Sequence, residues 1–175
     1  MKKLFLAAFV LLLTSMAQAQ YKPDEQNSSL KFTIKNLGFG VNGSFSGFDG
    51  NINFNPEDLA ASNFDVTINA ATINTDNSLR DGHLKGDSFF DVKNYPKIRL
   101  ASSKITGSKS NYQFTGQLTI KGKSKAISFP FTALPVANGY NFKGSFKMNR
   151  KDFGVGGTST VSDELEVNIN VITKK

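Results

Sequence analysis

The stretch NYQFTGQLTI, residues 111–120, alternates apolar and polar side chains through most of its length. Its apolar members fall on one face of an extended chain: Tyr112, Phe114, Leu118 and Ile120. Because successive side chains of a strand point to opposite faces of a sheet, this pattern predicts a strand that is buried on one side and solvated on the other. Strands of this kind are typical of antiparallel sheets.

The same alternation recurs in seven further segments, at residues 30–34, 41–54, 64–70, 98–100, 127–131, 142–148 and 165–171. Few residues remain for helices that could cover so many apolar faces. Two packed sheets or one closed barrel would bury those faces, and closure also removes the exposed strand edges. We therefore predict an all-β fold, an eight-stranded antiparallel barrel whose interior has room for side chains or one small ligand.

Glycines mark two irregular points between or within these strands. In residues 41–54 the alternation slips between Phe45 and Phe48, and Gly43, Gly47 and Gly50 around the slip predict a bulge or a sharp coil of one long strand. Asn138-Gly139, between two alternating runs, predicts a two-residue hairpin turn with positive φ at both residues.

The longest segment without alternation is 75–92. A structureless loop of that length is unusual in a compact domain, so we expect a short helical segment near residues 76–90. Asp76 or Asn77 is the expected N-cap. Such a helix would place Arg80, His83 and Leu84 on one side.

Residues 1–19, MKKLFLAAFVLLLTSMAQA, have the organisation of a secretory signal peptide. Two lysines precede an apolar run that is too short for a permanent membrane helix, and Ala17-Gln18-Ala19 forms a small-x-small cleavage site. We expect cleavage after Ala19, a single domain over 20–175, and a periplasmic or secreted protein. The chain has no cysteine, so its core must be stable without disulfides.

Charge and composition narrow the classes of partner. Two of the 21 basic residues lie in the first 19, which leaves 19 basic against 14 acidic residues, a net charge of +5. These basic residues are scattered, and together with export this argues against nucleic acid as a partner. Transient contact with an anionic membrane surface is compatible with this charge.

Catalytic chemistry finds little support. One histidine and no cysteine disfavour a zinc or copper site. GFGVNG, residues 38–43, matches G-x-G-x-x-G, but an alternating strand follows it where a dinucleotide site requires a helix. No G-x-S-x-G nucleophile elbow is present. We expect no enzyme activity, no cofactor and no metal.

The segment RDGHLKGDSFFD, residues 80–91, concentrates charge beside two phenylalanines. One interpretation is a loop across the barrel mouth that ion pairs and hydrogen bonds to its own backbone hold in place. In the other, Arg80 and His83 contact the polar head group of a ligand whose apolar tail fills the barrel, since the planar fork of arginine suits phosphate. The residues leave both open.

Five segments together resemble the bacterial YceI-like, polyisoprenoid-binding family over essentially the whole chain after residue 19. In order, they are LKFTIKNLGFGVNGSFSGFDGNINF (30–54), LRDGHLKGDSFFDVKNYPKI (79–98), GQLTIKGKSK (116–125), MNRKDFGV (148–155) and VSDELEVNINV (161–171). The resemblance implies a lipocalin-like, eight-stranded barrel outside the cytoplasm. It also implies that some members hold a long isoprenoid lipid, such as a polyprenyl phosphate or a quinone, in the barrel.

Carried over to this chain, the resemblance implies two groups of site residues. The predicted lipid-tail contacts are Phe32, Phe45, Phe64, Phe89, Phe90, Phe114, Phe129 and Phe146. The predicted head-group or mouth residues are Arg80, Asp81, His83, Asn149, Arg150 and Asp152. We expect Arg80 or His83 to meet the carboxylate of Asp152 or Asp163. Asn36 stands where many members carry a histidine, so ligand preference differs here if that position contacts the head group.

Two functions follow from these observations. The first is a carrier or buffer for an isoprenoid lipid held in a hydrophobic cavity. The alternative is an exported stress-related or interaction protein whose barrel core is filled and takes no ligand. The two differ in whether the inward phenylalanines leave a cavity or interdigitate at core density. A homodimer with facing barrel mouths would double the channel length, and the sequence leaves this arrangement open.

Overall fold

The computed structural model describes residues 20–158 and 160–175, so the predicted signal peptide at 1–19 lies outside the described residues. The strands are β1 (Gln20–Pro23), β2 (Ser29–Asn36), β3 (Phe39–Phe45), β4 (Asp49–Asn53), β5 (Asn63–Asn69), β6 (Lys97–Ser108), β7 (Asn111–Ile120), β8 (Lys123–Val136), β9 (Gly139–Asn149) and β10 (Val161–Lys174). The helix α1 (Ser78–Lys85) separates β5 from β6. Short 3₁₀ helices lie at η1 (Glu25–Asn27), η2 (Leu59–Ala61), η3 (Ala70–Thr72) and η4 (Arg150–Phe153).

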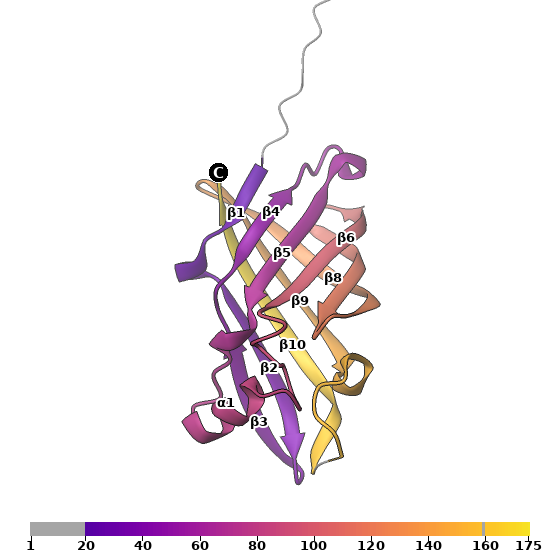
Figure 1. The fold of residues 1–175 in the computed structure, drawn as a ribbon. Coiled ribbons are helices and arrows are strands. Elements are labelled where there is room, and N and C mark those ends of the chain that lie inside the picture. Colours follow the sequence, from indigo (N-terminus) through magenta and orange to yellow (C-terminus); the bar gives the residue numbers. More distant parts are fainter. Residues whose placement is uncertain (1–19, 159) are drawn as a thin grey trace, which may run out of the picture.

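The ten strand segments close into one antiparallel barrel (Figure 1). Strand β10 pairs with β1 through Lys22↔Lys174 and with β2 through Leu30↔Ile169. On their other edges, β1 pairs with β4 and β2 pairs with β3. Thus β1 and β2 are two halves of one barrel strand that η1 interrupts, and β3 with β4 make up the next. The remaining six strands follow in chain order from β5 to β10. The predicted eight-stranded antiparallel barrel is confirmed.

The break between β3 and β4 confirms the predicted irregularity. β3 ends at Phe45 and β4 begins at Asp49. Gly47 between them has φ +72°, and a Cβ at this position would lie 2.7 Å from the Cβ of Asn69. Glycine is therefore required here both by the left-handed backbone and by the close approach of the end of β5.

The turn predicted at Asn138-Gly139 is wrong in position by one residue, and neither residue has the predicted positive φ. The hairpin between β8 and β9 exists, but Gly139 already pairs with Val136, so residues 137 and 138 form its turn. A Cβ on Gly139 would lie 2.5 Å from the carbonyl oxygen of Thr173. This glycine therefore allows β10 to approach closely, which is a contact between distant parts of the chain and not a local turn preference.

The barrel interior has two halves. Toward the termini an aromatic cluster fills it: the ring of Phe54 lies 5.2 Å from that of Tyr112, 5.0 Å from Tyr140 and 5.3 Å from Phe142, all nearly edge to face. The half next to α1 is lined by a second apolar cluster that includes Phe32. These edge-to-face arrangements favour the packing of the rings, so the terminal half is a packed core.

The predicted short helical segment is confirmed as α1. Its cap is Asn77, whose side chain accepts a hydrogen bond from the amide of Arg80. The helix lies beside β3 at the end of the barrel opposite the termini (Figure 1). No helix among the described residues is long and apolar enough to cross a membrane.

Candidate functional site

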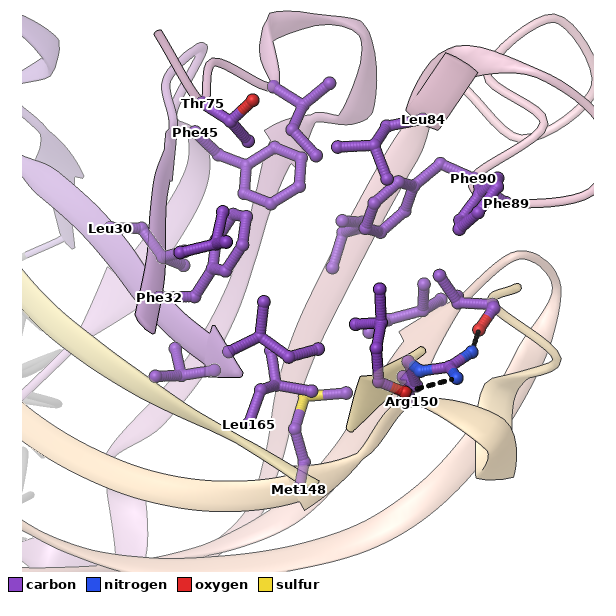
Figure 2. Close-up of a pocket in the computed structure, with 18 of the residues that line it drawn as sticks. Leu30, Phe32, Phe45, Thr75, Leu84, Phe89, Phe90, Met148, Arg150 and Leu165 are labelled. Carbon is purple, nitrogen blue, oxygen red and sulfur yellow. Dashed lines mark hydrogen bonds between the residues drawn. The ribbon is translucent and has the colours of Figure 1, made fainter. Parts of the chain in front are cut away.

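A cavity of about 160 Å³ occupies the half of the barrel next to α1. Strands provide most of its wall, with inward side chains such as Phe32 and Leu165. On the other side α1 and the loop after it contribute Leu84, Phe89 and Phe90 (Figure 2). The lining is almost entirely apolar, so this space suits a hydrocarbon group.

A second cavity of about 100 Å³ lies adjacent to the first, toward the aromatic cluster. Five side chains border both cavities: Leu30, Ile68, Ile98, Leu118 and Phe146. The two cavities therefore adjoin one another inside the barrel, with these five residues common to both linings.

The predicted tail contacts all border one of these two cavities. Phe32, Phe45, Phe89, Phe90 and Phe146 line the first cavity, and Phe64, Phe114, Phe129 and again Phe146 line the second. Sequence reasoning left out the aliphatic members of the wall, such as Ile68 and Leu118. These residues carry the same inward phase of the alternation, so the pattern contained the signal.

The helix α1 is tied to the buried residue Thr75, which directly follows the Ser44–Asn74 bridge between this segment and β3. The carboxylate of Asp81 accepts hydrogen bonds from the amide (2.9 Å) and the hydroxyl (2.6 Å) of Thr75. Arg80 donates from Nε to the same hydroxyl (2.7 Å) and from Nη2 to the Thr75 carbonyl (2.6 Å). Two charged residues predicted at the mouth thus hold the helix over the first cavity. Arg80 also borders that cavity.

His83 does not share the side of α1 that faces the cavity. Arg80 and Leu84 border the cavity, whereas His83 is exposed. Successive residues of a helix differ by about 100° in direction, so His83 cannot point the same way as Leu84. The expectation that all three lie on one side is wrong for this residue.

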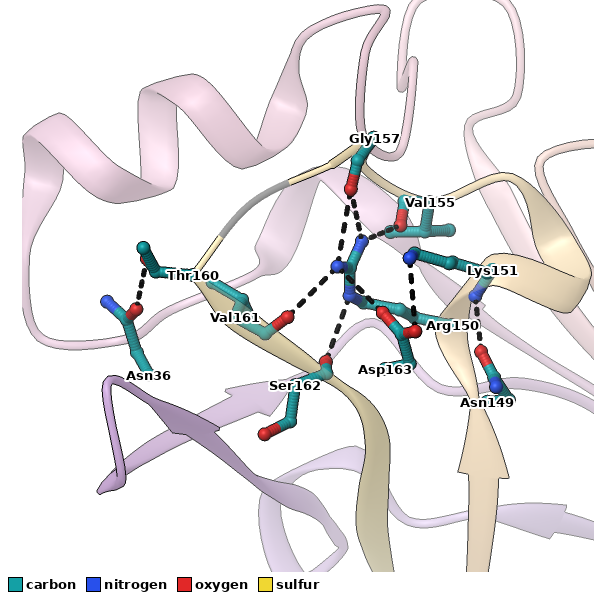
Figure 3. A network of polar contacts seen from close by, with 10 residues as sticks. All are labelled: Asn36, Asn149, Arg150, Lys151, Val155, Gly157, Thr160, Val161, Ser162 and Asp163. Carbon is teal, nitrogen blue, oxygen red and sulfur yellow. Dashed lines mark hydrogen bonds and ion pairs between the residues drawn. The ribbon is translucent and has the colours of Figure 1, made fainter.

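Arg150 is buried, and its guanidinium is engaged by the chain itself (Figure 3). It donates to the carbonyl oxygens of Val155 (2.8 Å), Ser162 (3.0 Å) and Val161 (3.1 Å). It also pairs with the carboxylate of Asp163 at 3.1 Å. These contacts hold the segment that joins η4 to β10, while Arg150 also borders the first cavity.

The expected pairing of Arg80 or His83 with Asp163 is wrong. Asp163 pairs with Arg150 and, through its other oxygen, with Lys151 at 3.0 Å. The reason is local: residues 150 and 151 begin η4 beside the first residues of β10.

The two other predicted residues of this motif lie at the surface. Asn149 caps η4 by accepting a hydrogen bond from the amide of Lys151, and Asp152 is exposed. Neither borders the first cavity. Both residues lie where β9 ends and η4 begins, away from the cavity.

Asn36 borders the first cavity and contacts the same connecting segment. Its side-chain oxygen accepts a hydrogen bond from the hydroxyl of Thr160 at 2.7 Å (Figure 3). This bond joins the end of β2 to Thr160 before β10, so Asn36 is held at the cavity border.

The chemistry of the site is that of binding. Guanidinium groups at the border can donate hydrogen bonds, and apolar side chains cover the rest. Within 20–158 and 160–175 there is no group of three or more His, Cys, Asp or Glu side chains that could hold a metal ion. Burial raises the pKa of Tyr140, which lies in the aromatic cluster away from this border.

Comparisons with known proteins agree with this geometry. A family model described as the YceI-like domain matches residues 21–173. The UPF0312 protein of Yersinia pestis strain Pestoides F is 30% identical over 180 residues, which cover 96% of this chain and 93% of that protein.

Solved structures show the same barrel. BcnA of Burkholderia cenocepacia is similar with a TM-score of 0.81 and 26% identity, over 87% of this chain and 99% of that chain. A polyisoprenoid binding domain from Saccharophagus degradans, implicated in plant cell wall breakdown, gives a TM-score of 0.71 over 88% of this chain and 97% of that chain. At 13% identity the second likeness shows the fold alone.

Proposed function

This chain belongs to the YceI-like family, and on that premise we propose that it binds a lipid inside the barrel. The ligand class we propose is a long-chain isoprenoid, a polyprenyl phosphate or a quinone, held as cargo by a carrier or buffer. The polyisoprenoid binding domain with the same fold supports this class. Binding alone is proposed, with no bond made or broken.

The observation that carries the proposal is the first cavity. An enclosed void of 160 Å³ costs a protein core about 4 kcal/mol at roughly 24 cal/mol per Å³, and because this cavity is partly open that figure is an upper limit. A chain selected for stability alone would fill it, as the rings of Phe54, Tyr112 and Tyr140 fill the interior nearer the termini. An apolar ligand would recover that free energy, at about 0.8 kcal/mol per buried CH₂.

The size of the cavities defines how a long chain would fit. An apolar cavity of about 150 Å³ holds a molecule the size of benzene, and the first cavity is of that order. A long isoprenoid therefore requires the two cavities to join. They share part of their lining, so rotation of residues such as Leu118 and Phe146 would open one channel.

The polar end of the ligand would lie at the border beside α1. Arg80 is placed there with its Nε and Nη2 on Thr75. Its Nη1 has no hydrogen-bond partner in the described part of the chain, and a phosphate or carbonyl oxygen would accept from it. Arg150 instead holds the backbone next to this border, as its contacts with Val155 and Ser162 indicate.

Residues 1–19 support a place for this function outside the cytoplasm. Their charge, apolar run and cleavage pattern are those of a secretory signal. We therefore propose that the domain from residue 20 onward acts in the periplasm or after secretion.

Native mass spectrometry of protein purified from its own host tests the proposal directly. A discrete extra mass that solvent extracts as a polyprenyl lipid is the expected result. If the protein has its bare mass and takes up neither added polyprenyl phosphate nor added quinone, the barrel is a filled scaffold and the lipid-binding function is wrong.

A further inference from the structure

The tip of the hairpin between β2 and β3 exposes two large apolar side chains. Leu37 is 71% exposed and Phe39 is 78% exposed. The hairpin lies at the end of the barrel opposite the termini, beside α1 (Figure 1), where Leu79 is also 80% exposed. Exposed apolar groups concentrated at one end of a molecule mark an interaction surface more often than chance.

The chain accepts a backbone cost to place a leucine at this tip. Leu37 and Gly38 form the turn with φ +50° and +86°. Left-handed backbone is unfavourable for a leucine, by roughly 1 kcal/mol. In the described part of the chain, the other two turns with consecutive positive φ begin with Lys109 and Lys121, so only this turn carries a large apolar residue first. Folding alone does not account for that choice.

The hairpin itself carries only positive charge, and the carboxylate that the adjoining strand β10 pairs with it is Glu166, which lies opposite Thr33. Residues 26–48 contain Lys31 and Lys35 and no carboxylate, and both lysines are exposed. An apolar tip with lysines behind it matches the boundary of an anionic bilayer, where apolar side chains enter the acyl region and cations meet the head groups. We propose that this hairpin tip docks the protein on an anionic lipid bilayer.

A second copy of the chain fits this surface less well. A stable protein interface buries about 1,200–2,000 Å², whereas this surface is a single two-residue turn with its flanking side chains. A bilayer requires no complementary shape, so a narrow tip is sufficient for docking. The tip adjoins the hairpin strands that line the first cavity, through residues such as Ile34 and Val41. Docking would therefore bring the cavity border to the membrane, a step that rests on the proposed lipid-binding function.

The absence of tryptophan from this chain makes the docking measurable. Phe39→Trp places a single tryptophan at the tip, and Leu134→Trp places one at a half-exposed apolar site on β8 as the matched control. The probe is vesicles of phosphatidylethanolamine with phosphatidylglycerol. On addition of vesicles, the tryptophan fluorescence of Phe39→Trp should shift to the blue and be quenched by brominated lipid, whereas that of Leu134→Trp should not change. Added salt should weaken the effect on Phe39→Trp, because the lysines contribute to binding.

A second variant quantifies the contribution of the tip. Leu37→Ser combined with Phe39→Ser should lower vesicle partitioning by roughly 10- to 100-fold, the loss expected when about one large apolar side chain is no longer buried. Neither residue borders a cavity, so this variant should keep the cargo of the unmodified protein. If the unmodified protein binds no lipid cargo, the proposed function is wrong, but the test of membrane docking with vesicles is not affected.

Three results would overturn the docking proposal. The first is no shift for Phe39→Trp with vesicles, and the second is an equal shift for both tryptophan variants. The third is a shift of Phe39→Trp that depends on protein concentration without vesicles and accompanies a doubled mass in sedimentation, which would assign the tip to a contact between two copies.

Discussion

Filling the first cavity should separate ligand binding from stability. Ile68 on β5 is buried and borders both cavities. Ile68→Phe adds three side-chain carbons, worth about 2 kcal/mol if the cavity accepts all of them. Ile105 on β6 is also buried and borders neither of the two cavities. The same change there must displace packed neighbours and should cost about 1–3 kcal/mol.

Urea unfolding of ligand-free protein measures both variants on one scale. The free energy of unfolding should stay level or rise by up to about 2 kcal/mol for Ile68→Phe, and should fall for Ile105→Phe. Lipid uptake, followed by native mass spectrometry, should fall for Ile68→Phe, with long chains lost before short ones because the added ring obstructs the passage between the cavities. Ile105→Phe should retain uptake as long as it is folded.

The reasoning is refuted if Ile68→Phe loses as much stability as Ile105→Phe, because the space would then be unable to accept atoms. It is equally refuted if Ile68→Phe takes up long-chain lipid as well as the unmodified protein does, because the ligand would then lie elsewhere.

Three further changes test the contacts around the site. Arg150→Leu should lower the free energy of unfolding in urea by about 3–5 kcal/mol, since it leaves buried carbonyl groups without a donor. A decrease below about 1 kcal/mol would show that water takes the place of the guanidinium as donor. Asp81→Ala removes the acceptor and should cost about 1.5–3 kcal/mol and speed hydrogen exchange at the Thr75 amide, and unchanged exchange would contradict the assigned contact. Hydrogen bonds from Arg99 lower the pKa of Asp65 in the folded protein. The pair therefore contributes its full stability at pH values above the unfolded pKa of about 3.9, and this contribution is lost as the pH falls through the lower folded pKa. Arg99→Ala should therefore reduce stability by less than about 1 kcal/mol at neutral pH and by nothing in strong acid, because the pair is half exposed; an equal loss at both pH values would exclude the ion pair as the cause.

Local patterns were sufficient for most strands and for their inward faces, but they did not predict β1. Phe114 and Leu118 are buried because alternation along a strand depends only on neighbouring residues. The cap of α1 was predictable for the same reason, since Asn77 bonds the amide of a residue three positions later. The bend at Gly47 could be read from the slip in the alternation.

Contacts between distant residues were outside the reach of these patterns. Gly139 looked like a turn residue, but its role is to admit the backbone of β10, about 35 positions away. Arg150 looked like a head-group ligand, although its nearest acceptors are carbonyl oxygens that the fold of the following segment brings to it. Such partners are set by how segments meet in space.

By itself, the sequence determined an all-β barrel and the set of side chains that face its interior, because period-two burial is a property of each strand alone. Only the tertiary structure decided where aromatic rings pack around Phe54 and where that interior keeps its two cavities. It also placed His83 outside and Arg80 at the border. The physical reason is that packing and cavities depend on strand register and closure, through which residues far apart in the chain, such as Phe54 and Phe142, come into contact.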